Sequence, residues 1–370
     1  MKKDLKISFW ADTDKGGVYD VLGSFGAAFS KALSKVVEIV PIKDVLEGTP
    51  VNAMFSFNST GYEQWSKAMN SNVKNVIWSV DSFFYNNFYL YDRFSVNPNF
   101  VLLDIVPSDK SPIAFYAPSF KHCNYFPHAT DFDFWKYKES KKEHDVVFFG
   151  SIIDLESRIE EMSQKYPKEL LDIIFEMKET SLSYPEQPFW NLYLSAQKCY
   201  GLELEKPVFH EIFLDLADVC EAQQRINMVK SLSKFNVEVF GNGPWEKYIS
   251  GNVKYRGALN VVDTVDVMNK SKISLHIQPM KLSGGLHERF LNASAVKTFT
   301  LMGINPWIEK DFGDAFGYFD CSNFADIEDV LSDYLNNEEK RIAQVDKAYD
   351  IVKNKHTWDN RASDFVNLFK

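Results

Sequence analysis

Short apolar segments that alternate with helical segments constrain the fold of this 370-residue chain more than any other feature of its sequence. Strand-like segments lie at residues 5–11, 36–40, 53–57, 73–80, 101–106, 114–117, 145–150, 237–241, 253–257, 273–277 and 298–302. Helical patterns lie at 18–33, 62–69, 261–269, 287–297, 327–336 and 338–352. Strands that are connected through helices pair in parallel and are covered on both faces. The sequence therefore predicts an α/β fold.

The alternation is interrupted twice: the first interruption separates two predicted domains, and the second marks a helical insertion in the second domain. The first series of strands ends near residue 120, and the second begins at Asp145. Helical patterns such as 157–165 and 208–232 then replace strands early in the second series. Because 370 residues exceed the usual size of one hydrophobic core, two domains are expected. We predict an N-terminal domain at 1–120, a linker at 121–144, a C-terminal domain at 145–355 with a helical insertion at 155–234, and a terminal helix at 356–370.

Composition excludes several classes of protein. Apolar residues make up 45% and charged residues 25%, which is typical of globular chains, and the net charge of −10 does not indicate nucleic-acid binding. No segment approaches the ~20 apolar residues that span a bilayer, and the charged N-terminus is unlike a secretory signal. The four cysteines form no Cys-x-x-Cys pair. We expect a cytoplasmic protein without a membrane span, a nucleic-acid partner or a metal site.

Candidate functional residues in the first domain follow the strands, because open α/β sheets bind ligands beyond the carboxyl ends of their strands. Gly16 and Gly17 come after the first strand, where they allow close approach of an anion to the backbone or form a plain turn. Asp12 and Asp81 also follow strands. Each is a candidate general base, and the alternative is a helix N-cap or a turn.

Glycine turns follow two strands of the second domain. Gly150 and Ser151 follow one strand, and Gly241 and Asn242 follow the next. Such turns place backbone N–H groups where they can bind a phosphate, although glycine turns are also common without a ligand.

The densest group of polar residues follows the strand at 273–277. Two glycines there precede a helix whose first turn carries an arginine and a glutamate. The helix N-terminus and the guanidinium suit a pyrophosphate, and the carboxylate suits ribose hydroxyls. The alternatives are dipole compensation for the glutamate and a buried structural role for the first histidine. The candidates are His276, Gln278, Gly284, Gly285, His287, Glu288 and Arg289. No His-Glu-x-x-His or Gly-x-Ser-x-Gly pattern is present.

Several segments resemble CgeB-like glycosyltransferases, which are of the glycosyl transferases group 1 type. Residues 145–151, 237–241, 253–257 and 272–277 look like successive strands of that family. Residues 287–295 are similar to its Arg-x-Phe-Glu-Ala-Leu-Ala helix, and 356–361 match its His-Thr-aromatic-x-x-Arg ending. Weaker similarities occur at 78–81 and 126–129. The resemblance covers residues 145–370 well and the first domain loosely.

This resemblance implies a GT-B fold, in which two Rossmann-like domains face each other across a cleft and a C-terminal helix returns to the first domain. It implies a nucleotide-sugar donor on the C-terminal domain and a hydroxyl acceptor, which would be a glycan, a lipid-linked sugar or a protein such as flagellin. No bound metal or other cofactor is expected. Arg289 would neutralise the leaving diphosphate, and Asp12 or Asp81 would serve as base in an inverting reaction.

Two positions depart from the pattern of the family. The glutamate of its helix falls on Asn292, and a glycine just beyond falls on Lys297. These departures leave open the alternative of a non-catalytic GT-B protein that binds nucleotide sugars. A GT-B sugar-nucleotide epimerase is a further alternative.

Overall fold

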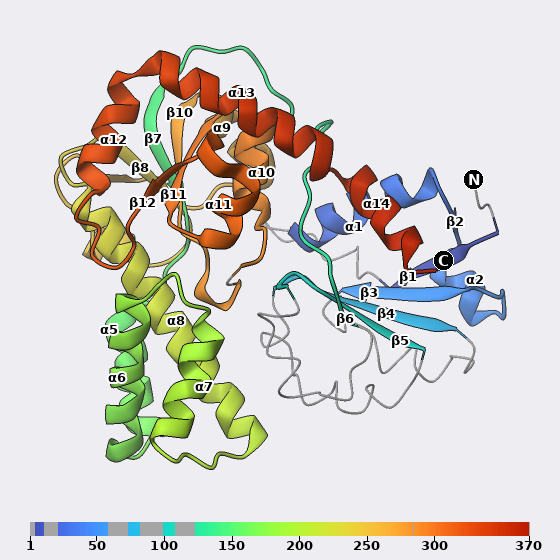
Figure 1. Ribbon diagram of the computed structural model, residues 1–370, viewed down its shortest axis with the longest axis horizontal. Helices are drawn as coiled ribbons and strands as arrows, with labels where there is room; N and C mark the ends of the chain where they lie inside the picture. The colour runs from blue at the N-terminus through green and yellow to red at the C-terminus, as the bar shows by residue number, and fades with distance from the viewer. Residues whose placement is uncertain are drawn as a thin grey trace. The chain divides into compact units, whose positions relative to one another are not determined.

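The computed structural model describes residues 4–10, 21–57, 73–81, 99–107, 123–282 and 284–369. The chain divides into two compact units (Figure 1), residues 1–134 with 353–370 and residues 135–352. Among these described residues, each unit contains one six-stranded sheet. Within the described ranges, no helix combines the length and the apolar character that crossing a membrane requires.

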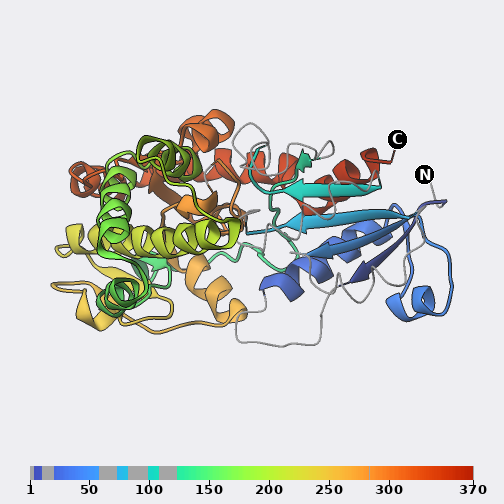
Figure 2. The same ribbon diagram turned by 90° about the horizontal axis from the view of Figure 1, so that it is seen from below.

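The sheet of unit 1 is parallel throughout, in the order β2-β1-β3-β4-β5-β6. Its strands fan out in one direction (Figure 2), and every residue of β3 and β5 is buried, as expected of strands with both faces covered. The strands are β1 (Lys6–Trp10), β2 (Glu38–Ile39), β3 (Ala53–Phe57), β4 (Lys74–Ser79), β5 (Phe100–Asp104) and β6 (Cys123–Tyr125). The helices in the described part of unit 1 are α1 (Val21–Ser34), α2 (Ile42–Leu46) and α14 (Trp358–Asn367).

The C-terminal helix α14 packs into the core of unit 1. Phe29 of α1 stands edge-on to Phe365 of α14, with 5.7 Å between the ring centroids. Thr357 and Asn360 cap the start of α14 reciprocally. The predicted return of the C-terminal helix to the first domain is confirmed.

The segments around 78–80, 126–128 and 356–361 meet in one buried cluster. Trp78 Nε1 donates to the Phe126 carbonyl at 2.8 Å, and His128 Nε2 donates to the Val80 carbonyl at 2.8 Å. Arg361 is 4% exposed and donates to the Pro127 carbonyl at 2.9 Å and to His356 Nδ1 at 3.0 Å. These similarities to the family therefore lie at a structural attachment of α14.

The sheet of unit 2 is also parallel, in the order β12-β11-β10-β7-β8-β9. This is the doubly wound Rossmann order, in which the chain reverses direction across the sheet between β7 and β10. The strands are β7 (His144–Phe149), β8 (Val237–Phe240), β9 (Lys254–Tyr255), β10 (Ser271–His276), β11 (Phe299–Gly303) and β12 (Gly317–Phe319). The helices are α9 (Val261–Asn269), α10 (Glu288–Ala295), α11 (Pro306–Phe312), α12 (Ile327–Asn336) and α13 (Glu338–Lys355), with short 3-10 turns η3 (Trp245–Lys247), η4 (Met280–Leu282) and η5 (Gly313–Ala315).

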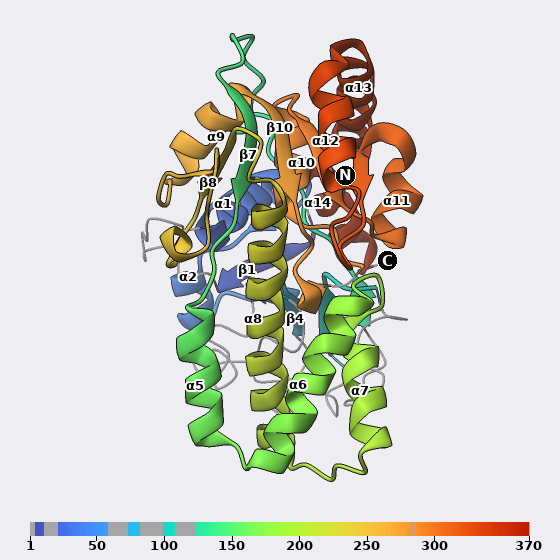
Figure 3. The same cartoon turned by 90° about the vertical axis from the view of Figure 1, so that its left-hand side faces the viewer.

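Four helices between β7 and β8 form a bundle of their own (Figure 3), namely α5 (Leu155–Lys165), α6 (Lys168–Ser183), α7 (Phe189–Cys199) and α8 (Lys206–Ser231). Asp215 of α8 is buried and accepts hydrogen bonds from Arg158, Lys165 and Tyr166 at 2.8, 2.7 and 2.6 Å. These bonds attach the α5 side of the bundle to α8.

The α/β fold with two Rossmann-like units is confirmed. The strand expected at 114–117 and the helix expected at 62–69 lie outside the described residues. The short elements α2, β6, α11 and β12 were not predicted, because segments of three to seven residues are too short to show a clear periodicity.

Candidate functional site

The candidate site of unit 2 lies at the carboxyl ends of β7, β8 and β10, where the strand order reverses. Gly150 N–H donates to the Phe240 carbonyl at 2.8 Å, and Asn242 N–H donates to Ser151 Oγ at 3.0 Å. A Cβ on Gly241 would lie 2.2 Å from the Gly150 carbonyl oxygen. The two turns therefore pack directly on each other, and the N–H groups of Gly150 and Asn242 are already paired within the protein.

A polar network continues from the end of β10. Gln278 Nε2 donates to the carbonyls of Leu282 and Gly285, both at 2.9 Å, so its Oε1 is the atom that faces His276 Nε2 at 3.2 Å. Burial, assisted by the charge of Arg289, lowers the pKa of His276 to about 3. His276 is therefore neutral, with its proton on Nε2, and it holds the loop after β10 through Gln278.

The loop between β10 and α10 presents Glu288 and Arg289 at a helix N-terminus. His287 is the N-cap, and its Nδ1 accepts from Arg289 N–H at 3.2 Å and lies 3.1 Å from Glu288 Oε2. The sequence placed His287 within the first turn, so its role as a cap is a correction. Gly284 has a φ of +80° and packs against Trp307, where a Cβ would lie 2.6 Å from Cδ1. Its glycine character is thus required by packing as well as by backbone conformation.

Two positions that depart from the family pattern lie along and just beyond α10. Asn292 is 5% exposed and lies one turn after Glu288. Lys297 has a φ of +54°, a left-handed conformation that favours glycine. Its Nζ pairs with Asp346 at 2.8 Å and lies 4.9 Å from the ring centroid of Tyr349. The chain therefore places a lysine in a backbone conformation suited to glycine and retains it through side-chain contacts.

One residue at this site was missed from the sequence. Arg225 of α8 donates through Nη1 to the Ser151 carbonyl at 2.6 Å and through Nη2 to Glu221 Oε2 at 3.2 Å. The only signal in the sequence was a glutamate and an arginine four residues apart on a long apolar helix.

The first-domain candidates cannot be joined into a site. Asp12, Gly16 and Gly17 lie outside the described residues. Asp81 follows β4 in unit 1 and is partly buried. Across the described parts of both units, no three His, Cys, Asp or Glu side chains are grouped as metal ligands.

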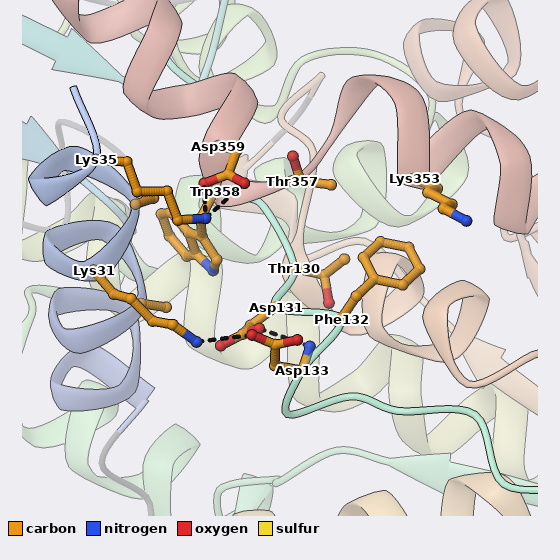
Figure 4. A pocket seen from close by; sticks show the side chains of 12 residues that line it. Lys31, Lys35, Thr130, Asp131, Phe132, Asp133, Lys353, Thr357, Trp358 and Asp359 are labelled. Carbon is orange, nitrogen blue, oxygen red and sulfur yellow. Dashed lines mark hydrogen bonds and ion pairs between the residues drawn. The ribbon is translucent and has the colours of Figure 1, made fainter.

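Unit 1 has a separate hollow between α1, residues 130–133 and the start of α14 (Figure 4). Lys31 Nζ pairs with Asp133 at 2.8 Å, and Lys35 Nζ pairs with Asp359 at 2.7 Å (Figure 4). Both lysines are more than half exposed at their side chains, with 59% and 55% accessible. Because Lys31 and Lys35 each already pair with a carboxylate, these two cations do not concentrate anions in the hollow.

The geometry of unit 2 agrees with comparisons against known proteins. Residues 223–367 match the family model described as "Glycosyl transferase-like". This segment includes the carboxyl end of β8, the loop after β10 and α10. No curated protein sequence matches the chain.

Solved structures share the fold at low sequence identity. Sucrose-phosphate synthase from Thermosynechococcus elongatus superposes with a TM-score of 0.61 at 7% identity, over 99% of this chain and 98% of that one. HepE from Anabaena, in complex with UDP and glucose, gives 0.54 at 11% identity over 99% of both chains. An α-glucosyltransferase in complex with UDP-glucose and DNA gives 0.60 at 9% identity over 98% of both chains. These likenesses confirm the GT-B fold, whereas the CgeB-like subtype stays a prediction.

Proposed function

We propose that this protein is a glycosyltransferase that moves a sugar from a nucleotide-sugar donor to a hydroxyl acceptor. The observation that carries the proposal is the grouping of His276, Glu288 and Arg289 at the switch point of unit 2, inside the segment that matches the glycosyl transferase-like model. Structural neighbours bound to UDP and UDP-glucose support the same class of donor.

In this proposal, Arg289 neutralises the diphosphate that leaves the donor. Arg289 is the second residue of α10, so its guanidinium and the N-terminal dipole of the helix act on one anion. Glu288 and Asn292, one turn apart, accept donor hydroxyls. The turns at Gly150–Ser151 and Gly241–Asn242 contact the donor through their closely packed backbone. Asp12 or Asp81 acts as base if the reaction inverts configuration, with Gly16 and Gly17 near the donor phosphates.

The acceptor in this proposal is a surface glycan, a lipid-linked sugar or a protein such as flagellin, and the reaction is cytoplasmic. Some structural neighbours bind DNA. The net charge of −10 favours a non-nucleic-acid acceptor for this chain, because binding the phosphate backbone of a nucleic acid relies on many cationic side chains. We also propose that transfer needs no bound metal, so EDTA should leave it unchanged.

The test is a thermal-shift screen with UDP, GDP, dTDP and CMP sugars. A ligand at ~100 times its dissociation constant stabilises the folded state by roughly 2.7 kcal/mol. Arg289→Lys keeps the charge but loses the bidentate fork, so turnover should fall; Arg289→Ala should lower it further. Nucleotide affinity and turnover that are unaltered in Arg289→Ala would remove this residue from the site.

Product analysis distinguishes the alternatives that Asn292 and Lys297 leave open. Donor hydrolysis or transfer supports the glycosyltransferase. Tight binding with no turnover on any acceptor indicates a non-catalytic protein, and an isomerised donor without transfer indicates an epimerase.

A further inference from the structure

The upper end of α8 belongs to the same surface as the ends of β7 and β10. Arg225 contacts the Ser151 carbonyl at 2.6 Å, directly after β7. α8 also packs against η4, and Gln224 lines one hollow together with Gln278 and Met280 of the loop after β10. Figure 3 shows α8 running from the bundle to these strands. Helix α8 of the insertion therefore forms one wall of the site at the switch point of the sheet.

In the part of the chain that the structure describes, two buried acceptor atoms at this wall have no hydrogen bond. Glu221 is 6% exposed, and its Oε2 accepts from Arg225 while its Oε1 has no partner among the described residues. His276 is 1% exposed, and its Nδ1, the unprotonated nitrogen, is likewise without a partner in the described structure. Buried acceptors are normally satisfied, because an unmade bond costs free energy. These two atoms therefore indicate a ligand that carries hydrogen-bond donors.

Two guanidiniums accompany these acceptors. Arg225 donates to Glu221 and to the Ser151 carbonyl, and Arg289 follows His287, whose ring centroid lies 5.6 Å from that of His276. The positive charges of both arginines also lower the pKa of His276. A ligand that suits the four groups combines an anion with hydroxyls. A nucleoside diphosphate sugar has both.

We propose that α8 completes the donor site, with Arg225 binding the donor diphosphate together with Arg289, and with Glu221 orienting Arg225 through Oε2 and accepting a donor hydroxyl at Oε1. This inference rests on the proposed function. It assigns part of donor binding to the helical insertion, which lies outside the strand-to-helix turns where sequence reasoning placed the site.

The experiment uses the full chain and isothermal titration with UDP, GDP, dTDP and CDP and with the corresponding monophosphates. Arg225→Ala, Arg225→Lys and Glu221→Gln are compared with Lys230→Ala, which removes an exposed cation from the same helix. Circular dichroism and the melting temperature without ligand establish that each variant is folded. Arg225→Lys retains the positive charge, so it serves if Arg225→Ala does not fold.

The relevant nucleotide is the diphosphate that the wild type binds most tightly. We expect Arg225→Ala to weaken binding of this diphosphate by at least about 10-fold and binding of the corresponding monophosphate by less than about 3-fold. Arg225→Lys and Glu221→Gln should lower the same diphosphate-to-monophosphate preference by smaller factors, and Lys230→Ala should match the wild type. A purely structural role would weaken both nucleotides equally and would overturn the inference, as would wild-type diphosphate affinity in Arg225→Ala. If the wild type binds none of the nucleotides, the proposed function fails as well. If Arg289→Ala loses the diphosphate while the Arg225 variants retain it, only this inference fails.

Discussion

Lowering the pH from 7 to 5 should destabilise both units through one buried histidine in each. Burial is the largest cause that lowers the pKa of His356 in unit 1 and of His276 in unit 2, both to about 3. Arg361 and Lys355 add to the shift at His356, and Arg289 and Arg225 add to it at His276. Since the ordinary pKa is about 6.5, the unfolded chain binds these protons first as the pH falls. Their contribution to stability is complete above pH 6.5 and is lost progressively down to about pH 3.

The size of the effect follows from the two pKa values. A pH of 5 lies about 1.5 units below the pKa of a histidine in the unfolded chain, so that histidine is protonated, while each of these two histidines is still neutral in the folded protein. Each pH unit corresponds to about 1.4 kcal/mol, so each histidine should cost about 2 kcal/mol of unfolding free energy between pH 7 and pH 5.

Urea unfolding at pH 7 and pH 5 tests this reasoning in the wild type, His356→Gln and His276→Gln. Each glutamine variant is expected to be less stable at pH 7, because a hydrogen bond changes, but to lose about 2 kcal/mol less than the wild type on acidification. The remaining histidines contribute equally to all three proteins and cancel in the comparison. If both variants lose as much stability as the wild type, the two rings are not held neutral and the argument is refuted.

Three further substitutions test the backbone and the buried cluster. Lys297→Gly should be more stable than Lys297→Ala by about 1 kcal/mol, since both lose the side chain but only alanine keeps the strain of a φ of +54°; equal melting temperatures would contradict this. Gly241→Ala should cost at least about 3 kcal/mol in urea unfolding because its Cβ would lie 2.2 Å from the Gly150 carbonyl oxygen, whereas Gly257→Ala, with a φ of +79° and open space, should cost about 1 kcal/mol. Arg361→Lys should lower the unfolding free energy by about 3 kcal/mol, because a lysine cannot reproduce the bonds to Pro127 and His356; a loss under about 1 kcal/mol would argue against the attachment of α14 described above.

Local pattern was sufficient for the longer elements and for the fold class. The helices at Val261–Asn269 and Ile327–Asn336 have the bounds that periodicity predicted, and β3 coincides with its apolar segment at 53–57. The buried face of each of these elements consists of residues that are close in sequence, so a short segment is sufficient to predict it. The strand–helix alternation likewise predicted parallel sheets, because parallel strands need crossover connections.

Tertiary structure alone decided which distant residues meet. Arg225 and Ser151 are in contact although they are 74 residues apart in the sequence, and Arg361 and Pro127 are in contact although they are 234 residues apart. The same packing buries His276, leaves its Nδ1 without a partner among the described residues, and sets the left-handed backbone at Lys297. The sequence determined the elements and the strand ends where a ligand site was expected, since periodicity and turn chemistry are local. The pairing of those ends with α8 depends on how the four-helix insertion folds back onto the sheet, a free-energy balance of packing and loop closure that no local pattern records.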